Sequence, residues 1–131
     1  MRTKENLVNP VSDYYLYQPS TIASRVYLYP KEIGYFFYEP GYWRSRIQYD
    51  SFLLMYIAKG TCQVLLPNQQ LQNAAAGQVV LIDCYVPHEY GFDSNSEVAW
   101  IHFDGPLARD FYDLIFASHG NIISPSNPFP I

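Results

Sequence analysis

The sequence is poor in charge, in cysteine and in long apolar runs, and each shortage excludes a class of protein. Charged residues make up 15% of the 131 residues and the net charge is -4, so the chain lacks the basic surface that neutralises the phosphates of DNA. A typical apolar run, residues 52–58, is far shorter than the ~20 residues that cross a bilayer. We therefore expect neither direct DNA binding by this chain nor a membrane segment.

The two cysteines, Cys62 and Cys84, fall in apolar stretches typical of strands. The N-terminal residues 1–6 contain no apolar segment of the kind found in a secretory signal. These two features predict a protein of the reducing cytoplasm.

Aromatic residues are abundant, with 13 Tyr, 8 Phe and 2 Trp. A domain of this composition can line a cavity with apolar rings and still offer hydroxyl and indole donors inside it. The length suits a single domain with one hydrophobic core.

Short segments of β-branched and aromatic residues alternate with turn residues, which is typical of an all-β sandwich or barrel. In the last segment both faces are largely apolar, so both must be covered. A barrel strand meets this requirement when its inner face lines a cavity and its outer face contacts an arm or a helix. The predicted strands are residues 25–29, 33–38, 46–58, 61–66, 79–83 and 97–103.

The two ends of the chain differ from this central region. Residues 1–24 carry prolines and tyrosines without a sustained period, and we interpret them as an N-terminal arm that folds back on a barrel of residues 25–104. Residues 105–119 form the predicted C-terminal helical segment. The Pro-rich residues 120–131 are interpreted as the start of a linker.

The helix itself is predicted over residues 107–118, where apolar side chains recur at helical spacing. Asp104 is the expected N-cap and Pro106 lies in the first turn. At the other end, His119 is suited to the negative end of the helix dipole, which is a sufficient account of it.

Three segments, in this order, resemble the amino-terminal domain of AraC-type transcription regulators: residues 49–60 (YDSFLLMYIAKG), residues 76–90 (AGQVVLI with PHEY behind it) and residues 100–105 (WIHFDG). The resemblance covers about residues 25–118. It implies a cupin-like barrel, that is, a double-stranded β-helix or jelly roll, that binds a small effector, often a sugar. It also implies a carboxy-terminal pair of helix-turn-helix motifs, which this sequence does not contain. We expect the protein to form a homodimer.

By the same resemblance, Trp100 matches the tryptophan that stacks on the sugar and Tyr90 matches a ligand-contacting tyrosine. An indole offers a sugar both a flat apolar face and an N–H donor. The alternative for both residues is a place in the core. Val98 stands where the arabinose-responsive member of the family has a polar residue, which argues against arabinose itself.

Further candidates for contact with the effector are His88, Glu39, Arg44 and Arg46. His88 could instead be a rim histidine that hydrogen-bonds to the backbone. Arg44 and Arg46 lie on one face of an extended segment and could bind a carboxylate or phosphate, or simply be solvated. Glu39 could accept two sugar hydroxyls or be a solvated turn residue.

Enzymatic cupins hold a metal through a His-x-His pair and a carboxylate in a first motif and one more histidine in a second. His88 could match the last of these, but no histidine precedes it, and a catalytic metal needs about three protein ligands. We therefore predict no metal, no cofactor and no catalysis, and a structural role for His102. The alternatives are a small metal-dependent cupin enzyme, such as an isomerase or dioxygenase, and an interaction module whose aromatic residues only fill the core.

Overall fold

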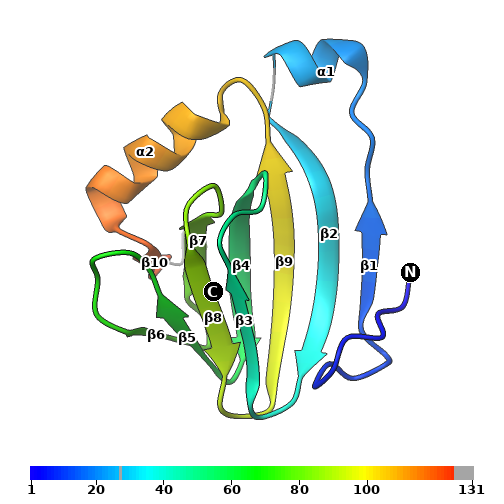
Figure 1. Ribbon diagram of the computed structural model, residues 1–131, viewed down its shortest axis with the longest axis vertical. Coiled ribbons are helices and arrows are strands. Elements are labelled where there is room, and N and C mark those ends of the chain that lie inside the picture. Colours follow the sequence, from blue (N-terminus) through cyan, green and yellow to red (C-terminus); the bar gives the residue numbers. More distant parts are fainter. Residues whose placement is uncertain (27, 126–131) are drawn as a thin grey trace, which may run out of the picture.

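The computed structural model describes residues 1–26 and 28–125. Within them the chain is mainly β, as the sequence predicts, with one short and one longer helix (Figure 1). The elements are β1 (Asp13–Leu16), α1 (Thr21–Val26), β2 (Tyr29–Tyr38), β3 (Tyr42–Arg46), β4 (Phe52–Lys59), β5 (Thr61–Leu65), β6 (Gln72–Ala75), β7 (Val79–Asp83), β8 (His88–Phe92), β9 (Ser96–Asp104), α2 (Ala108–His119) and β10 (Ile122–Ile123).

The strands form two antiparallel sheets that face each other (Figure 1). The larger sheet has the order β1-β2-β9-β4-β7-β10 and the smaller one the order β3-β8-β5-β6. Alternate side chains of both sheets point into the space between them and form the main core. This core includes Val98 and Trp100 from β9, Met55 from β4, Val64 from β5 and Phe92 from β8.

The outer face of the larger sheet is covered at one end by α2. Phe103 of β9 packs there with Phe52 and Leu81, beneath Ala108 and Tyr112 of the helix. The prediction that both faces of the last long strand are covered therefore holds only at its Phe103 end, because Ala99 and Ile101 on the same outer face remain partly exposed. None of the helices in the described residues is long and apolar enough to cross a membrane.

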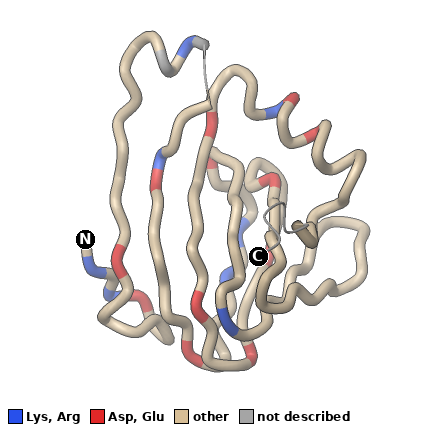
Figure 2. The backbone as a smooth tube through the Cα atoms, turned by 180° about the vertical axis from the view of Figure 1, so that it is seen from behind, with Lys and Arg blue, Asp and Glu red and all other residues tan. Residues whose placement is uncertain are grey.

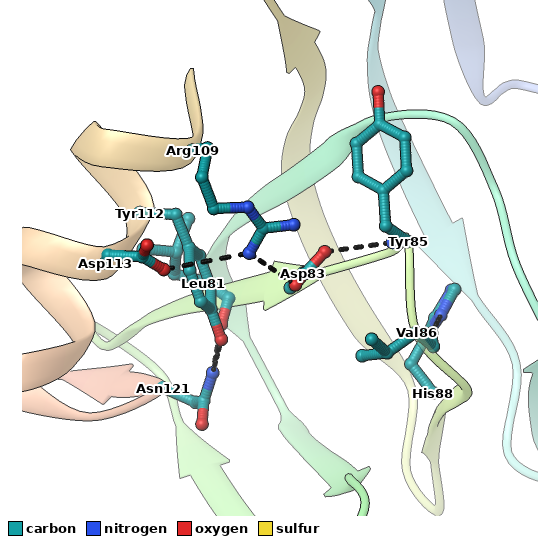
Figure 3. A network of polar contacts seen from close by, with 9 residues as sticks. All are labelled: Leu81, Asp83, Tyr85, Val86, His88, Arg109, Tyr112, Asp113 and Asn121. Carbon is teal, nitrogen blue, oxygen red and sulfur yellow. Dashed lines mark hydrogen bonds and ion pairs between the residues drawn. The ribbon is translucent and has the colours of Figure 1, made fainter. Parts of the chain in front are cut away.

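Polar contacts fix α2 to the sheet (Figure 3). Arg109 donates to the Asp83 carboxylate over 2.7 Å. Asn121, just beyond the helix, is buried, and its amide donates to the backbone oxygen of Leu81 and to the Tyr112 hydroxyl. Both ends of the helix are thus tied to β7.

Two predicted boundaries are wrong at the helices. The predicted strand 25–29 is not formed, because α1 continues to Val26 and β2 begins only at Tyr29. Asp104 is not the N-cap of α2; Leu107 holds that position without a side-chain cap. Asp104 is engaged elsewhere, since its backbone pairs with Tyr29 in the sheet and its carboxylate accepts a hydrogen bond from Tyr85.

The predicted strand 46–58 begins too early, because its first residue ends β3, residues 47–51 are in no strand, and residues 52–58 belong to β4 in the other sheet. β3 ends at Arg46 and β4 begins at Phe52. The chain turns between them, where the Ser51 amide donates to the backbone oxygen of Tyr49.

The N-terminal residues run along the edge of the larger sheet. β1 pairs with β2, and the Tyr14 ring packs edge-on against Phe36 at 6.1 Å. The amide of Glu39 donates to the backbone oxygen of Leu7, which ties the first residues to the turn after β2. At the other terminus, β10 pairs with β7 within the segment interpreted as a linker, whose residues 126–131 lie outside the described residues.

Candidate functional site

A cavity of about 280 Å³ lies between the two sheets on the inner face of β9. It draws side chains from the larger sheet, the smaller sheet and the N-terminal arm, so segments far apart in the sequence meet there. Its lining residues are Thr3, Glu5, Tyr14, Glu32, Phe36, Tyr38, Tyr42, Arg44, Arg46, Tyr90, Trp100 and His102.

Trp100 forms part of the apolar wall of this cavity. It projects inward because alternate residues of β9 face the core, and only 8% of it is exposed. Its ring meets Phe36 edge-on at 5.0 Å and His102 at 5.6 Å. The indole Nε1 is buried and has no hydrogen-bond partner in the described part of the chain.

The basic part of the lining comes from β3, where Tyr42, Arg44 and Arg46 share the inward face. In the β3–β8 pair, Arg44 lies opposite Tyr90 and Arg46 opposite His88. Arg44 forms an ion pair of 2.8 Å with Glu5 of the arm. Arg44 Nε and Arg46 Nη1 are buried and, among the residues described, have no hydrogen-bond partner.

His88 is buried in β8 and does not itself line the cavity. Its Nδ1 lies 2.9 Å from the backbone oxygen of Val86 (Figure 3). A carbonyl can only accept, so Nδ1 carries the proton and Nε2 is left with its lone pair, for which residues 1–26 and 28–125 offer no partner. Burial lowers the pKa of His88, which favours this neutral form.

His102 lines the cavity beside Trp100 and shares a hydrogen bond of 2.8 Å with the Ser51 hydroxyl. Burial, and after it the charge of Arg46, lowers the pKa of His102 to about 3, so the ring is neutral. The sequence analysis assigned it only a structural role. Its alternation with Trp100 on one face of the strand was the signal for a place in the cavity.

The structure brings four of the predicted site residues together: Tyr90, Trp100, Arg44 and Arg46. Burial raises the pKa of Tyr90 to about 12, so its hydroxyl stays protonated. Val98 is fully buried in the core and Glu39 lies in the exposed turn after β2, and neither lines the cavity. Besides His102, the lining residues that sequence analysis missed are Thr3, Glu5, Tyr14, Glu32, Phe36, Tyr38 and Tyr42.

The donor set does not fit the metal centre of a cupin enzyme. Over the described ranges 1–26 and 28–125, no three side chains of the types His, Cys, Asp or Glu are grouped so that they could hold a metal ion. His88 and His102 are the histidines of the inner face, and each is occupied by a protein oxygen at Nδ1.

Comparison with known protein families gives one match over most of the chain: the model of the AraC-like ligand binding domain matches residues 29–129. No curated protein matches the chain in sequence.

Solved structures with the same fold share little sequence with this chain. A cupin 2 conserved barrel domain protein from Leptotrichia buccalis is 16% identical, with a TM-score of 0.57, over 79% of this chain and 43% of the other. The Cupin_2 domain of an XRE family transcriptional regulator from Enterobacter cloacae is 11% identical, with a TM-score of 0.52, over 72% and 97%.

An S161A mutant of Bacillus subtilis oxalate decarboxylase is 13% identical, with a TM-score of 0.59, over 99% of this chain and 41% of the other. At such identities the likeness shows the fold alone. The predicted cupin-like jelly roll is confirmed, and the chain spans less than half the length of the Leptotrichia and Bacillus proteins.

Proposed function

This chain belongs to the AraC-like ligand binding domain family, and we propose that it binds a small metabolite, such as a carbohydrate, in the cavity between its sheets. The bound metabolite then controls a DNA-binding part of a longer regulator. The regulatory, ligand-binding role rests on the family. The identity of the site and the class of ligand rest on the geometry described above.

One observation carries the proposal: buried donors without partners surround an aromatic cavity. Trp100 Nε1, Arg44 Nε and Arg46 Nη1 all lack hydrogen-bond partners in the described residues. A buried donor left without an acceptor costs about 1–3 kcal/mol. A polar ligand that supplies acceptors here removes that cost, and this favours a binding site over a core that is merely filled.

The aromatic wall favours a ligand with one apolar face. Trp100 and Phe36 meet edge-on, and the tyrosines of the lining are Tyr14, Tyr38, Tyr42 and Tyr90. A sugar ring presents C–H groups on its faces and hydroxyls around its edge, which suits rings and donors placed together.

We propose that the N-terminal arm closes the mouth of the cavity. Thr3 and Glu5 belong to the lining, and Glu5 accepts a hydrogen bond of 2.5 Å from the Tyr42 hydroxyl besides its ion pair with Arg44. A ligand that binds the closed arm better than the open arm shifts the balance between the two states by that difference in affinity. The arm can in this way report occupancy to the rest of the regulator.

The regulator is further proposed to act as a cytoplasmic homodimer without catalytic activity. Cys62 and Cys84 are buried and unpaired, which suits a reducing compartment. The alternative is a metal-dependent enzyme, so a measurement of the metal content of the purified protein tests the prediction that the chain catalyses no reaction.

A thermal-shift screen against neutral and acidic saccharides, amino sugars and small aromatic acids, with a divalent-metal panel alongside, tests the proposal. A ligand at ~100 times its Kd adds about 2.7 kcal/mol to the free energy of unfolding. We expect a rise in Tm with a polar metabolite that is lost in Trp100→Phe and kept in Trp43→Phe, since Trp43 is 46% exposed on the opposite face of β3. A rise with metal alone would favour the enzyme, and silence throughout would favour the interaction module.

A further inference from the structure

Resting on the proposed function, we propose that the ligand is a small carboxylic acid whose carboxylate binds the Arg46 guanidinium. The proposal narrows the ligand class from polar metabolites to carboxylic acids and gives the two arginines of β3 different roles. Arg44 holds the arm, and Arg46 holds the ligand.

Arg46 carries a charge that the described residues do not neutralise. A guanidinium keeps its proton at any physiological pH and offers five donors. No carboxylate of the described residues lies within ion-pair distance of Arg46, although such pairs exist for Arg44 and Arg109. Its guanidinium carbon lies 4.0 Å from the centre of the Tyr49 ring, and its Nη1 is buried without a hydrogen-bond partner.

Both carboxylates that line the cavity are engaged with other groups. Glu5 pairs with Arg44 at 2.8 Å and accepts from the Tyr42 hydroxyl. Glu32 accepts a hydrogen bond from the Tyr49 hydroxyl. Since a partly buried cation is costly without an anion, an anion supplied by the ligand is the remaining source of a partner.

Three polar side chains near Arg46 bring no charge of their own. The two inward histidines, His88 and His102, are neutral, because burial and the charge of Arg46 both lower their pKa values. Tyr90 keeps its proton because burial raises its pKa. Since Arg44 and Glu5 form an ion pair, the charges left in the lining are Arg46 and Glu32, which do not pair with each other, and the wall made by Trp100 and Phe36 is aromatic.

This arrangement fits a ligand with a carboxylate at one end and a ring at the other. A planar carboxylate can take two parallel hydrogen bonds from a guanidinium, whereas the ring contacts Trp100 and Phe36. A volume of about 280 Å³ restricts the ligand to a small molecule. An acidic sugar and an aromatic acid share this chemistry, and the experiment separates them.

Calorimetric titrations compare acids with neutral partners of the same shape: glucuronate with glucose, galacturonate with galactose, and benzoate with benzyl alcohol. We expect one acid to bind at least about tenfold more tightly than its neutral partner, which corresponds to about 1.4 kcal/mol. The sugar pairs and the aromatic pair then identify the type of acid.

The variants Arg46→Gln and Arg44→Gln form the matched control. Arg46→Gln is expected to abolish the preference for the acid, and Arg46→Lys to keep part of it, because the charge remains. Arg44→Gln is expected to weaken both the acid and its neutral partner, because it removes a donor of the cavity and the ion pair with the arm, and to leave a preference for the acid.

Equal binding of an acid and its neutral partner, or a preference that survives Arg46→Gln, would overturn the carboxylate inference and leave the proposed function standing. Binding of neutral sugars alone would likewise overturn the carboxylate inference and leave the proposed function standing. If no compound in the titrations or the wider screen binds, both the inference and the proposed function are wrong.

Discussion

Gly34 lies directly opposite Trp100 in the β2–β9 pair, and a β-carbon placed on Gly34 would lie 2.5 Å from the indole ring. The backbone oxygen of Asp13 in β1 would lie 3.0 Å from the same carbon. The indole therefore keeps its place in the cavity wall because position 34 has no side chain.

Gly34→Ala is expected to displace the Trp100 ring. Forcing an extra methyl group into a packed site costs about 1–3 kcal/mol, so we expect Tm to fall by several degrees and the affinity for the ligand to fall with it. A calorimetric melting curve measures the first effect. In a Trp100→Phe background the two atoms that clash, Cζ2 and Cε2 of the indole, are gone, so the same substitution should cost less. An equal cost in both backgrounds would contradict this account.

The neutral state of His102 makes stability depend on pH. Its pKa is about 3 in the folded protein and 6.5 when unperturbed, so between these values the unfolded chain binds one more proton. Stability from this group is therefore complete above pH 6.5 and is lost as the pH falls toward 3, by at most about 1.4 kcal/mol per pH unit. Urea unfolding at several pH values measures this slope.

His102→Gln should reduce the slope, and the exposed His119→Gln should leave it unchanged. Part of the slope is expected to remain, because burial also lowers the pKa of His88. A slope that is the same in His102→Gln and in the parent chain would show that His102 is not held neutral.

Asn121→Ala tests the attachment of α2. The substitution removes the donor to Leu81 and Tyr112 in a buried site, and an unsatisfied buried group costs about 1–3 kcal/mol. We expect chemical denaturation to show a loss of this size. Asn73→Ala, on the exposed face of β6, should change stability by no more than about 0.5 kcal/mol.

Removal of residues 1–12 tests the closure of the cavity. This truncation takes away Thr3 and Glu5 but keeps β1. In a Trp43→Phe background Trp100 is the single tryptophan, and acrylamide should quench it more strongly after the truncation. The ligand should also dissociate faster. Unchanged quenching and unchanged dissociation would show that the arm does not close the mouth.

Local pattern was enough to place the residues of one strand. The alternation of β9 predicts that Val98, Trp100 and His102 share a face, and the structure puts all three inside. The same argument places Arg44 and Arg46 together on β3. Alternation cannot predict which of the two arginines forms an ion pair. The partner of Arg44 is Glu5, which lies far away in the sequence, in the N-terminal arm.

The missed elements lack a strong local signal. β6 (QNAA) contains no β-branched or aromatic residue, and β8 (HEYGF) has two aromatic residues but no β-branched one. Their strand character therefore depends on pairing, of β6 with β5 and of β8 with β3 and β5. In the predicted strand 46–58, the polar residues between Arg46 and Phe52 mark the turn that separates two sheets. Charged residues also mark where strands end: Figure 2 shows them near the ends of β2 and β9 and none in the middle of either strand.

The measurement that tests the central claim most directly is a fluorescence titration of the parent chain and of its single-tryptophan variant Trp43→Phe with the compound found in the screen. If the ligand lies in the cavity, the emission of Trp100 in Trp43→Phe shifts with a midpoint at the calorimetric Kd. The shift in the parent chain should have the same midpoint, because Trp43 is 46% exposed on the outer face of β3 and should add only an unresponsive background. A shift that is present in the parent chain and absent in Trp43→Phe, where Trp100 is the single tryptophan, would place the ligand outside the cavity and contradict the account.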